Sequence, residues 1–228
     1  MFLDILRFLL SGVCHQIPEH ALVVGGQALP LCARCTGTFL GLPAGLLALW
    51  AAGQGRRSGM PRGGMRFVLA LPVLAWAVDG TNALVGDLLG RPWLYEPTNA
   101  LRLITGTGLG LALSTLLHPT IHYALGRDVL EEPILDRPGY VVALALVGSA
   151  LVVALLAGPA MPYAVGAVAL AMVTVGVLAL VNAILIILAL HREGTVGVWG
   201  GAGYAAMGLA AAMAEMGALA LVRWLIVG

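Results

Sequence analysis

The stretch TGTFLGLPAGLLALWAAGQGRRSGMPRGGMR, residues 36–66, contains the pattern on which the fold depends. Residues 36–54 are almost entirely apolar or small, whereas the twelve residues that follow hold four arginines and no acid. A hydrocarbon core about 30 Å thick needs about 20 apolar residues of helix to cross it. Residues 36–54 therefore predict a transmembrane helix, and the arginine-rich loop predicts the side of the membrane on which that helix ends.

The composition of the whole chain agrees with this interpretation. The 228 residues are 60% hydrophobic and only 10% charged, and the mean hydropathy is +0.97, outside the range of soluble domains. The formal net charge of +1 gives no basis for binding nucleic acid. We therefore expect an all-α integral membrane protein in a lipid bilayer, with about six transmembrane helices. The five further apolar runs are 66–86, 99–117, 139–158, 163–190 and 202–224.

The arginine-rich loop also predicts the orientation, because short loops rich in arginine stay on the cytoplasmic side. The first transmembrane helix then runs inward, and its N-terminal end lies at the outer face. By alternation, segments 86–99 and 158–162 lie outside, and segments 118–138 and 191–195 lie inside. We expect a multi-pass protein of a prokaryotic cell membrane.

All three cysteines of the chain, Cys14, Cys32 and Cys35, lie at this predicted outer end. The Cys32-x-x-Cys35 spacing lets two thiolates bind one metal ion or form one redox-active disulfide. Cys14 can add a third thiolate, and thiolate ligands favour zinc or iron among the available metals. The predicted cofactor is therefore Zn or Fe, with these three cysteines as ligands. The candidates for a fourth ligand are a water molecule and three nearby side chains, His15, His20 and Asp79.

The same cysteines permit two other interpretations. The oxidising outer face favours disulfides, and three cysteines leave one unpaired, which suits a relay in which Cys14 attacks a Cys32–Cys35 bridge. Cys35 lies at the start of the first predicted helix, and a helix N-terminus lowers the pKa of a thiol. The purely structural alternative is a bridge, or a set of buried thiols, that only ties down the N-terminal segment.

Polar residues also interrupt the second and third predicted transmembrane helices near the same end. Asp79 and Asn82 are three residues apart and share a helix face, and Asn99 and Arg102 repeat this spacing, with Thr105 one turn further. A charge inside a spanning helix costs roughly 2.5–3.5 kcal/mol and is usually paired or functional. A buried Asp79–Arg102 ion pair is the structural alternative. We expect the catalytic residues to be His15, Asp79 and Arg102. The predicted substrate-binding residues are Asn82, Asn99, Arg102 and Thr105.

These residues resemble the motifs of a family of small prokaryotic integral membrane proteins, described only as a domain of unknown function. The resemblance covers about the first 110 residues, and the chain departs from the family's pattern at PEHAL, residues 18–22. It implies that the polar residues and the cysteines belong to one site, and it implies no particular activity. The matching motifs are Cys14-His15-Gln16 with Pro18, Pro30-Leu31-Cys32-Ala33-Arg34-Cys35-Thr36-Gly37, Asp79-Gly80 with Asn82, and Arg102 with Thr105-Gly106.

The remaining polar residues mostly receive structural explanations. His118 and His122 are four apart, but Pro119 between them predicts a loop. Asn182 is predicted to hydrogen-bond between helices, whereas Glu215 either joins the site or hydrogen-bonds a neighbour. Small-residue stripes allow the first and third spanning helices to approach closely. The glycines concerned are Gly37, Gly41, Gly45, Gly106 and Gly110.

We therefore expect a single polytopic domain, 1–228, in four parts. Residues 1–35 form a short interfacial helix (2–13) and a cysteine-containing hairpin, and 36–117 form the site-bearing helices. Residues 118–138 form a cytoplasmic loop, interpreted as a solvated linker, and 139–228 form three supporting helices.

The predicted function is that of a membrane-embedded metal-binding protein. Its finer form is a metal-dependent enzyme acting on a lipid, a lipid-linked compound or an anionic small substrate. The alternatives are a quinone-linked thiol–disulfide oxidoreductase using Cys32 and Cys35, and an ion or metal transporter. All three functions, and whether the protein is an enzyme, remain open from the sequence.

Overall fold

The computed structural model describes residues 1–125, 130–194, 196 and 198–227. Residues 126–129 of the predicted loop 118–138, and Thr195 of the segment 191–195, lie outside the described residues. Six helices in the described part are long and apolar enough to cross a membrane, which confirms the predicted fold class. They are α2 (Ala33–Leu49, continued by a π-helical turn at Trp50–Gln54), α3 (Met65–Leu89), α4 (Asn99–Leu125), α5 (Pro138–Leu156), α6 (Tyr163–Ala189) and α7 (Val198–Val227).

The N-terminal segment also forms the predicted helix and hairpin. Helix α1 spans Phe2–Leu10, and after a 3₁₀ turn at Pro18–His20 the chain forms the antiparallel strands β1 (Ala21–Val24) and β2 (Gln27–Cys32). The strands meet in a two-residue turn, Gly25-Gly26, in which both residues have positive φ, 56° and 77°. This is the backbone that a tight hairpin requires and that glycine adopts without strain.

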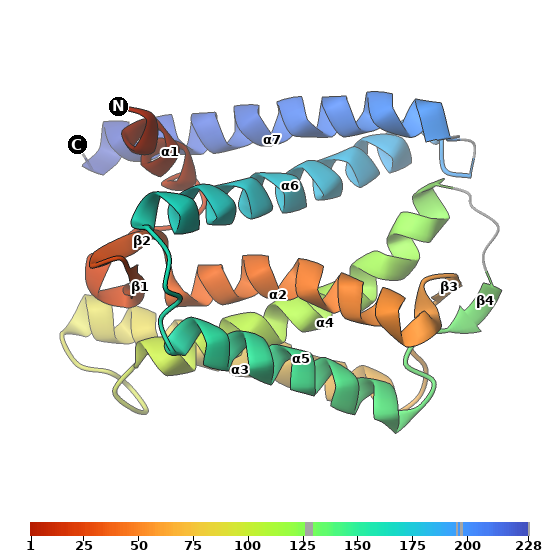
Figure 1. The fold of residues 1–228 in the computed structure, drawn as a ribbon, viewed down its shortest axis with the longest axis horizontal. Helices are drawn as coiled ribbons and strands as arrows, with labels where there is room; N and C mark the ends of the chain where they lie inside the picture. Colours follow the sequence, from red (N-terminus) through yellow and green to blue (C-terminus); the bar gives the residue numbers. More distant parts are fainter. Residues whose placement is uncertain (126–129, 195, 197, 228) are drawn as a thin grey trace.

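The helices lie in two layers (Figure 1). Helices α1, α6 and α7 form one layer, and α2, α3, α4 and α5 form the other. The β1–β2 hairpin and both chain termini lie at one end of the helices, which we call the hairpin end. A short parallel pair, β3 (Arg57–Gly59) and β4 (Leu130–Pro133), lies at the opposite end, which we call the β3–β4 end.

Helices α2 and α4 form the closest helix pair, through the predicted glycine stripes. A Cβ added at Gly37 would lie 2.6 Å from the carbonyl oxygen of Leu103, and one at Gly41 would lie 2.8 Å from that of Thr107. Gly106 lies still closer to the backbone of Arg34. Only glycine allows the two backbones to touch in this way. This contact fixes the start of α2, with its cysteines, against the start of α4.

The predicted loop at 118 is wrong, because α4 continues through Pro119 to Leu125. Proline is tolerated in a spanning helix where neighbouring groups replace the lost hydrogen bonding. Here His118 is buried and its Nε2 lies 3.1 Å from the carbonyl oxygen of Gln54. That contact ties α4, beside its proline, to the π-helical turn that ends at Gln54.

The segment that follows is also more ordered than a solvated linker. β4 pairs with β3, with Arg57 opposite Leu130, and Ile134 and Leu135 are fully buried against α2 and α5. Arg57 binds Asp136 at 2.9 Å, and this guanidinium lowers the pKa of the Asp136 carboxyl. The apolar Ile-Leu pair, rather than the surrounding charges, decides the position of the segment.

Candidate metal centre

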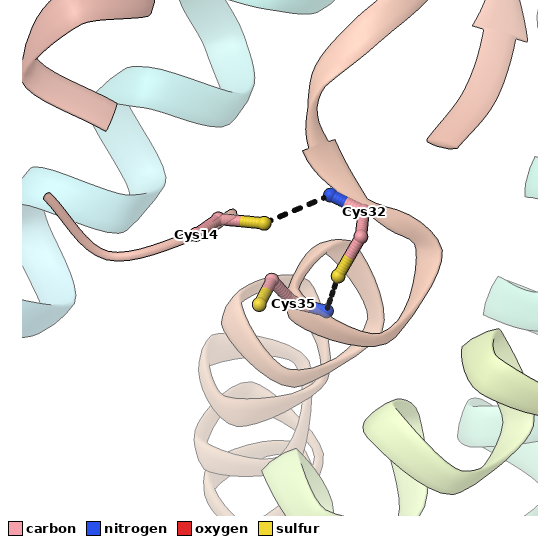
Figure 2. A group of neighbouring side chains, drawn as sticks. All are labelled: Cys14, Cys32 and Cys35. Atoms are coloured by element: carbon pink, nitrogen blue, oxygen red, sulfur yellow. Dashed lines mark hydrogen bonds between the residues drawn. The ribbon is translucent and has the colours of Figure 1, made fainter. Parts of the chain in front are cut away.

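The sulfur atoms of Cys14, Cys32 and Cys35 all lie within 4.8 Å of one another (Figure 2). All three cysteines are free thiols. Cys14 and Cys32 are buried, 6% and 2% exposed, and Cys35 is partly buried. Residues 18 positions apart in the sequence are thus brought into one cluster. In the described part of the chain, this is the group of cysteine, histidine or acidic side chains that fits a metal ion.

Three elements position the thiols. Cys14 follows the end of α1, where its N–H donates to the Leu10 carbonyl, 3.1 Å away. Cys32 ends β2 and caps the N-terminus of α2, and Cys35 lies in the first turn of that helix. The loop carrying Cys14 is held on two sides. Gln16 donates to the carbonyl of Pro30, and Arg223 of α7 donates to the carbonyl of Cys14.

Backbone N–H groups point at two of the sulfurs. The N–H of Cys32 donates to the sulfur of Cys14 at 3.2 Å, and that of Cys35 donates to the sulfur of Cys32 at 3.5 Å (Figure 2). The interaction with the Cys32 thiol lowers the pKa of Cys14 below its ordinary value, and it raises the pKa of Cys32. Such N–H donors stabilise a negatively charged sulfur, which is the form that binds metal.

The geometry suits a tetrahedral ion. Zinc–sulfur bonds of about 2.3 Å place the sulfurs of a tetrahedral site about 3.8 Å apart. Sulfurs within 4.8 Å reach that spacing by small side-chain rotations. Three thiolates leave one position for a further ligand.

Two histidines lie beside the cluster without joining it. Nδ1 of His15 lies 4.0 Å from the sulfur of Cys14, and its Nε2 lies 3.2 Å from Nδ1 of His20. Nε2 of His20 lies 3.7 Å from the carboxylate of Asp87. Burial, and next the nearby charge of Arg102, lower the pKa of His20, so that its imidazole is neutral at neutral pH. The predicted neighbours of Cys14 therefore form a row leading away from the cluster.

Asp79 is fully buried and its partner is Arg34, which the sequence did not identify. Arg34 Nε donates to Asp79 Oδ2 at 2.9 Å, and its Nη2 donates to the same oxygen and to the Asp79 carbonyl. Thr105 donates to Oδ2 at 3.3 Å, and the Tyr95 hydroxyl donates to Oδ1 at 2.9 Å. Burial, and next Asp79, raise the pKa of Tyr95. The considered Asp79–Arg102 ion pair is therefore replaced by Asp79–Arg34, and Asp79 is too fully engaged to be a fourth metal ligand.

The two asparagines hold loops to the helices. Asn82 donates to the carbonyl of Tyr95 at 2.8 Å and accepts from the N–H of Leu94 at 2.7 Å. Asn99 donates to the carbonyls of Glu19 and Ala21 at 2.9 and 3.1 Å. Asp79, Asn82, Asn99, Arg102 and Thr105 thus all lie at the hairpin end, where they bond to one another and to the loops of that end.

The polar residues far from the cysteines have separate structural contacts. Asn182 of α6 donates to Glu215 of α7 at 3.2 Å, so Glu215 hydrogen-bonds a neighbour instead of joining the site. The rings of His118 and His122 meet edge to face, 4.7 Å apart, near the β3–β4 end. Neither set contacts the thiol cluster.

Comparison with known proteins matches the same part of the chain. The family described as "Predicted membrane protein (DUF2085)" matches residues 14–116. The chain is 32% identical over 114 residues to an uncharacterized protein of Methanothermobacter thermautotrophicus, covering 48% of this chain and 92% of that protein. The chain belongs to this family. The matched stretch of this DUF2085 protein begins at Cys14 and contains every predicted site residue.

A second relative is an uncharacterized protein of Methanocaldococcus jannaschii, 29% identical over 109 residues. The match covers 48% of the DUF2085 chain and 64% of that protein, so the chain spans less than two thirds of its length. No solved structure matches the chain. Family membership together with the six apolar helices therefore establishes a multi-pass membrane protein, and neither names an activity.

Proposed function

We propose that this protein binds one zinc or iron ion through Cys14, Cys32 and Cys35, at the outer face of a prokaryotic cell membrane. The observation that carries the proposal is the clustering of the three sulfurs within 4.8 Å, two of them buried. Backbone N–H donors to two sulfurs and the loop contacts of Gln16 and Arg223 support a preformed site. The outer location follows from the arginine-rich loop at the β3–β4 end.

The finer form of the proposal is a metal-dependent enzyme that acts on a lipid or lipid-linked substrate. An apolar cleft of about 450 Å³ between α3, α4 and α5 supports it, because α3 and α4 also carry Asp79 and Arg102. Its lining includes Pro72, Ile104, Gly108, Leu144 and Val152. Ile104 lies next to Thr105 on α4, so an apolar chain in the cleft would end near the polar residues.

In this proposal, the contacts of each predicted site residue decide whether its role is structural or catalytic. Asp79, Asn82, Asn99 and Thr105 hold helices and loops together around the site. His15 lies nearest the thiols and is the proposed proton carrier of the catalytic form.

The second candidate is a quinone-linked thiol–disulfide oxidoreductase. The observation in its favour is that Cys14 lies close enough to both other thiols to exchange with a Cys32–Cys35 bridge. In that reaction the two thiols would lose two electrons and two protons to a quinone, which becomes the quinol. The Cys32-x-x-Cys35 pair at a helix N-terminus is the arrangement that makes one thiol reactive.

Metal content separates the two candidates. The protein is purified in detergent without added metal or chelator, and bound metal and free thiols are measured for wild type, Cys32→Ser and His118→Gln. We expect about one zinc or iron per chain in wild type, little in Cys32→Ser, and the wild-type amount in His118→Gln, which changes a histidine at the other end.

Metal retained in Cys32→Ser would contradict the proposed site. A metal-free wild type with one free thiol, and two free thiols in Cys32→Ser, would instead establish a Cys32–Cys35 disulfide. Quinone reduction would then be the next measurement.

A further inference from the structure

Arg102 is a buried guanidinium without a carboxylate partner. It is 6% exposed, its Nη1 donates to Oδ1 of Asn99 at 3.0 Å, and its buried Nε has no acceptor. In the described part of the chain it forms no ion pair. Burying an unpaired charge is strongly unfavourable, so a negative partner is expected.

The nearby acids do not fill that role. Arg34 and Asp79 form a neutral pair, in which both Asp79 oxygens already accept hydrogen bonds. Asp87 is 41% exposed and faces His20. In the described part of the chain, no carboxylate therefore lies within ion-pair distance of Arg102.

The thiol cluster is the neighbouring group that can carry the missing charge. Leu103, the residue after Arg102, is fully buried in the same packed cluster as Cys14 and Cys32. The close contact of α2 with α4 at Gly106 brings the start of both helices together. Arg102 thus lies in the first turn of α4, beside the start of α2, which carries Cys32 and Cys35.

We propose that Arg102 is the counter-charge of the metal–thiolate centre, and that this centre is a divalent ion with three thiolates and a neutral fourth ligand. The inference rests on the proposed metal site. Three thiolates with one divalent ion carry a single net negative charge, which Arg102 balances. A monovalent ion would leave one negative charge in excess, and a trivalent ion one positive charge. Arg102 is therefore a positioning residue that favours divalent zinc or ferrous iron over Cu(I).

The test measures the affinity for Co²⁺, whose thiolate complexes are coloured, in purified protein stripped of metal. Arg102→Gln is expected to weaken Co²⁺ binding about 10–100-fold, the range for residues that support a metal's ligands. Arg102→Lys keeps the charge and should recover most of the affinity. Arg66→Gln removes the same charge near the β3–β4 end, where Arg66 donates to the Pro61 carbonyl, and should have no effect.

A second pair of variants, both at Asn99, separates the effect of an added charge from the effect of lost hydrogen bonds. Asn99→Asp places a carboxylate beside Arg102 and should weaken Co²⁺ binding, because it supplies a competing counter-charge. Asn99→Ala loses the same bonds to the Glu19 and Ala21 carbonyls and adds no charge, so it should bind more tightly than Asn99→Asp.

Two failures are distinguishable. A wild-type protein that binds no Co²⁺ would overturn the metal site, and the inference with it. A wild type that binds Co²⁺, together with an Arg102→Gln variant of equal affinity or an Asn99→Asp variant no weaker than Asn99→Ala, would overturn the inference alone.

Discussion

Helices α2–α4 and helices α5–α7 are packed in different ways. Buried polar side chains are concentrated in α2–α4, where they include Asp79, Asn82, Arg102 and Thr105. In α5–α7, among residues whose side chains the structure describes, Thr174 is the buried polar one. The first three helices thus hold polar groups away from lipid, and the last three are joined by apolar surfaces.

The family match follows the same division, since residues 14–116 end within α4. The contacts explain why a site forms in one half and not in the other. In α2–α4, Asp79 joins α2, α3, α4 and the loop carrying Tyr95, whereas the Asn182–Glu215 bond joins only α6 and α7. We therefore propose that the candidate site belongs to α2–α4 and that α5–α7 support these helices.

The largest expected difference between the halves concerns their buried carboxylates. Asp79→Asn should lower the free energy of unfolding by about 3–5 kcal/mol, because it leaves the partly buried Arg34 without its counter-ion. The matched change, Glu215→Gln, keeps a side chain that can hydrogen-bond Asn182 and should shift stability by no more than about 0.6 kcal/mol, the average of interhelical hydrogen bonds in membranes. Tryptophan fluorescence of each protein during thermal unfolding in detergent measures both. Equal losses would remove the proposed distinction.

The sequence predicted the spanning helices well because each one needs only a sufficient length of apolar residues. The predicted run 99–117 ended too early, because Pro119 was taken as the end of the helix. The contact between His118 and the Gln54 carbonyl joins residues far apart in the sequence, so it could not be predicted from the local pattern. Leu130–Pro133 forms a strand because the next two residues, Ile134 and Leu135, are buried against Leu49 and hold the segment in place. Contacts between distant segments, rather than local preference, decided both.

The site was predicted in part for the same reason. The cost of a charge in the membrane identified Asp79 and Arg102 from the sequence, and the cysteine spacing identified the thiols. Arg34 was missed because the first spanning run was taken to begin at residue 36, which left Arg34 outside it; α2 begins at Ala33. The arginine that pairs with Asp79 depends on how α2 and α3 are rotated relative to α4. Residue spacing within one helix cannot predict that rotation.

A second comparison concerns a glycine that touches a neighbouring backbone and a glycine that does not, since α6 and α7 also touch at Gly208. A Cβ at Gly106 meets the carbonyl of Arg34, so Gly106→Ala must push α2 and α4 apart and should lower the free energy of unfolding by about 1–3 kcal/mol. Gly176 of α6 has nothing within 4 Å of an added Cβ. Gly176→Ala should therefore be neutral or stabilise by up to about 1 kcal/mol, since alanine favours helix. Thermal unfolding measures both, and a neutral Gly106→Ala would contradict the close packing.

The smallest expected difference concerns two buried threonines. The Thr105 hydroxyl lies 3.0 Å from the Leu101 carbonyl of its own helix and 3.3 Å from Asp79 Oδ2. Because Thr105→Val also removes the contact with Asp79 of α3, it should lower the free energy of unfolding by about 1 kcal/mol. The hydroxyl of Thr174 donates at 2.8 Å to Leu170 of its own helix, where the backbone already bonds, so Thr174→Val should be nearly neutral.

Thermal unfolding of the single and double variants measures whether Thr105 acts through Asp79. If it does, Thr105→Val should have little further effect in an Asp79→Asn background, because residues of one network are not additive. The effect of Thr174→Val should be the same in both backgrounds, since Thr174 shares no partner with Asp79. Full additivity of Thr105→Val with Asp79→Asn would show that the polar half consists of separate contacts instead of one connected network.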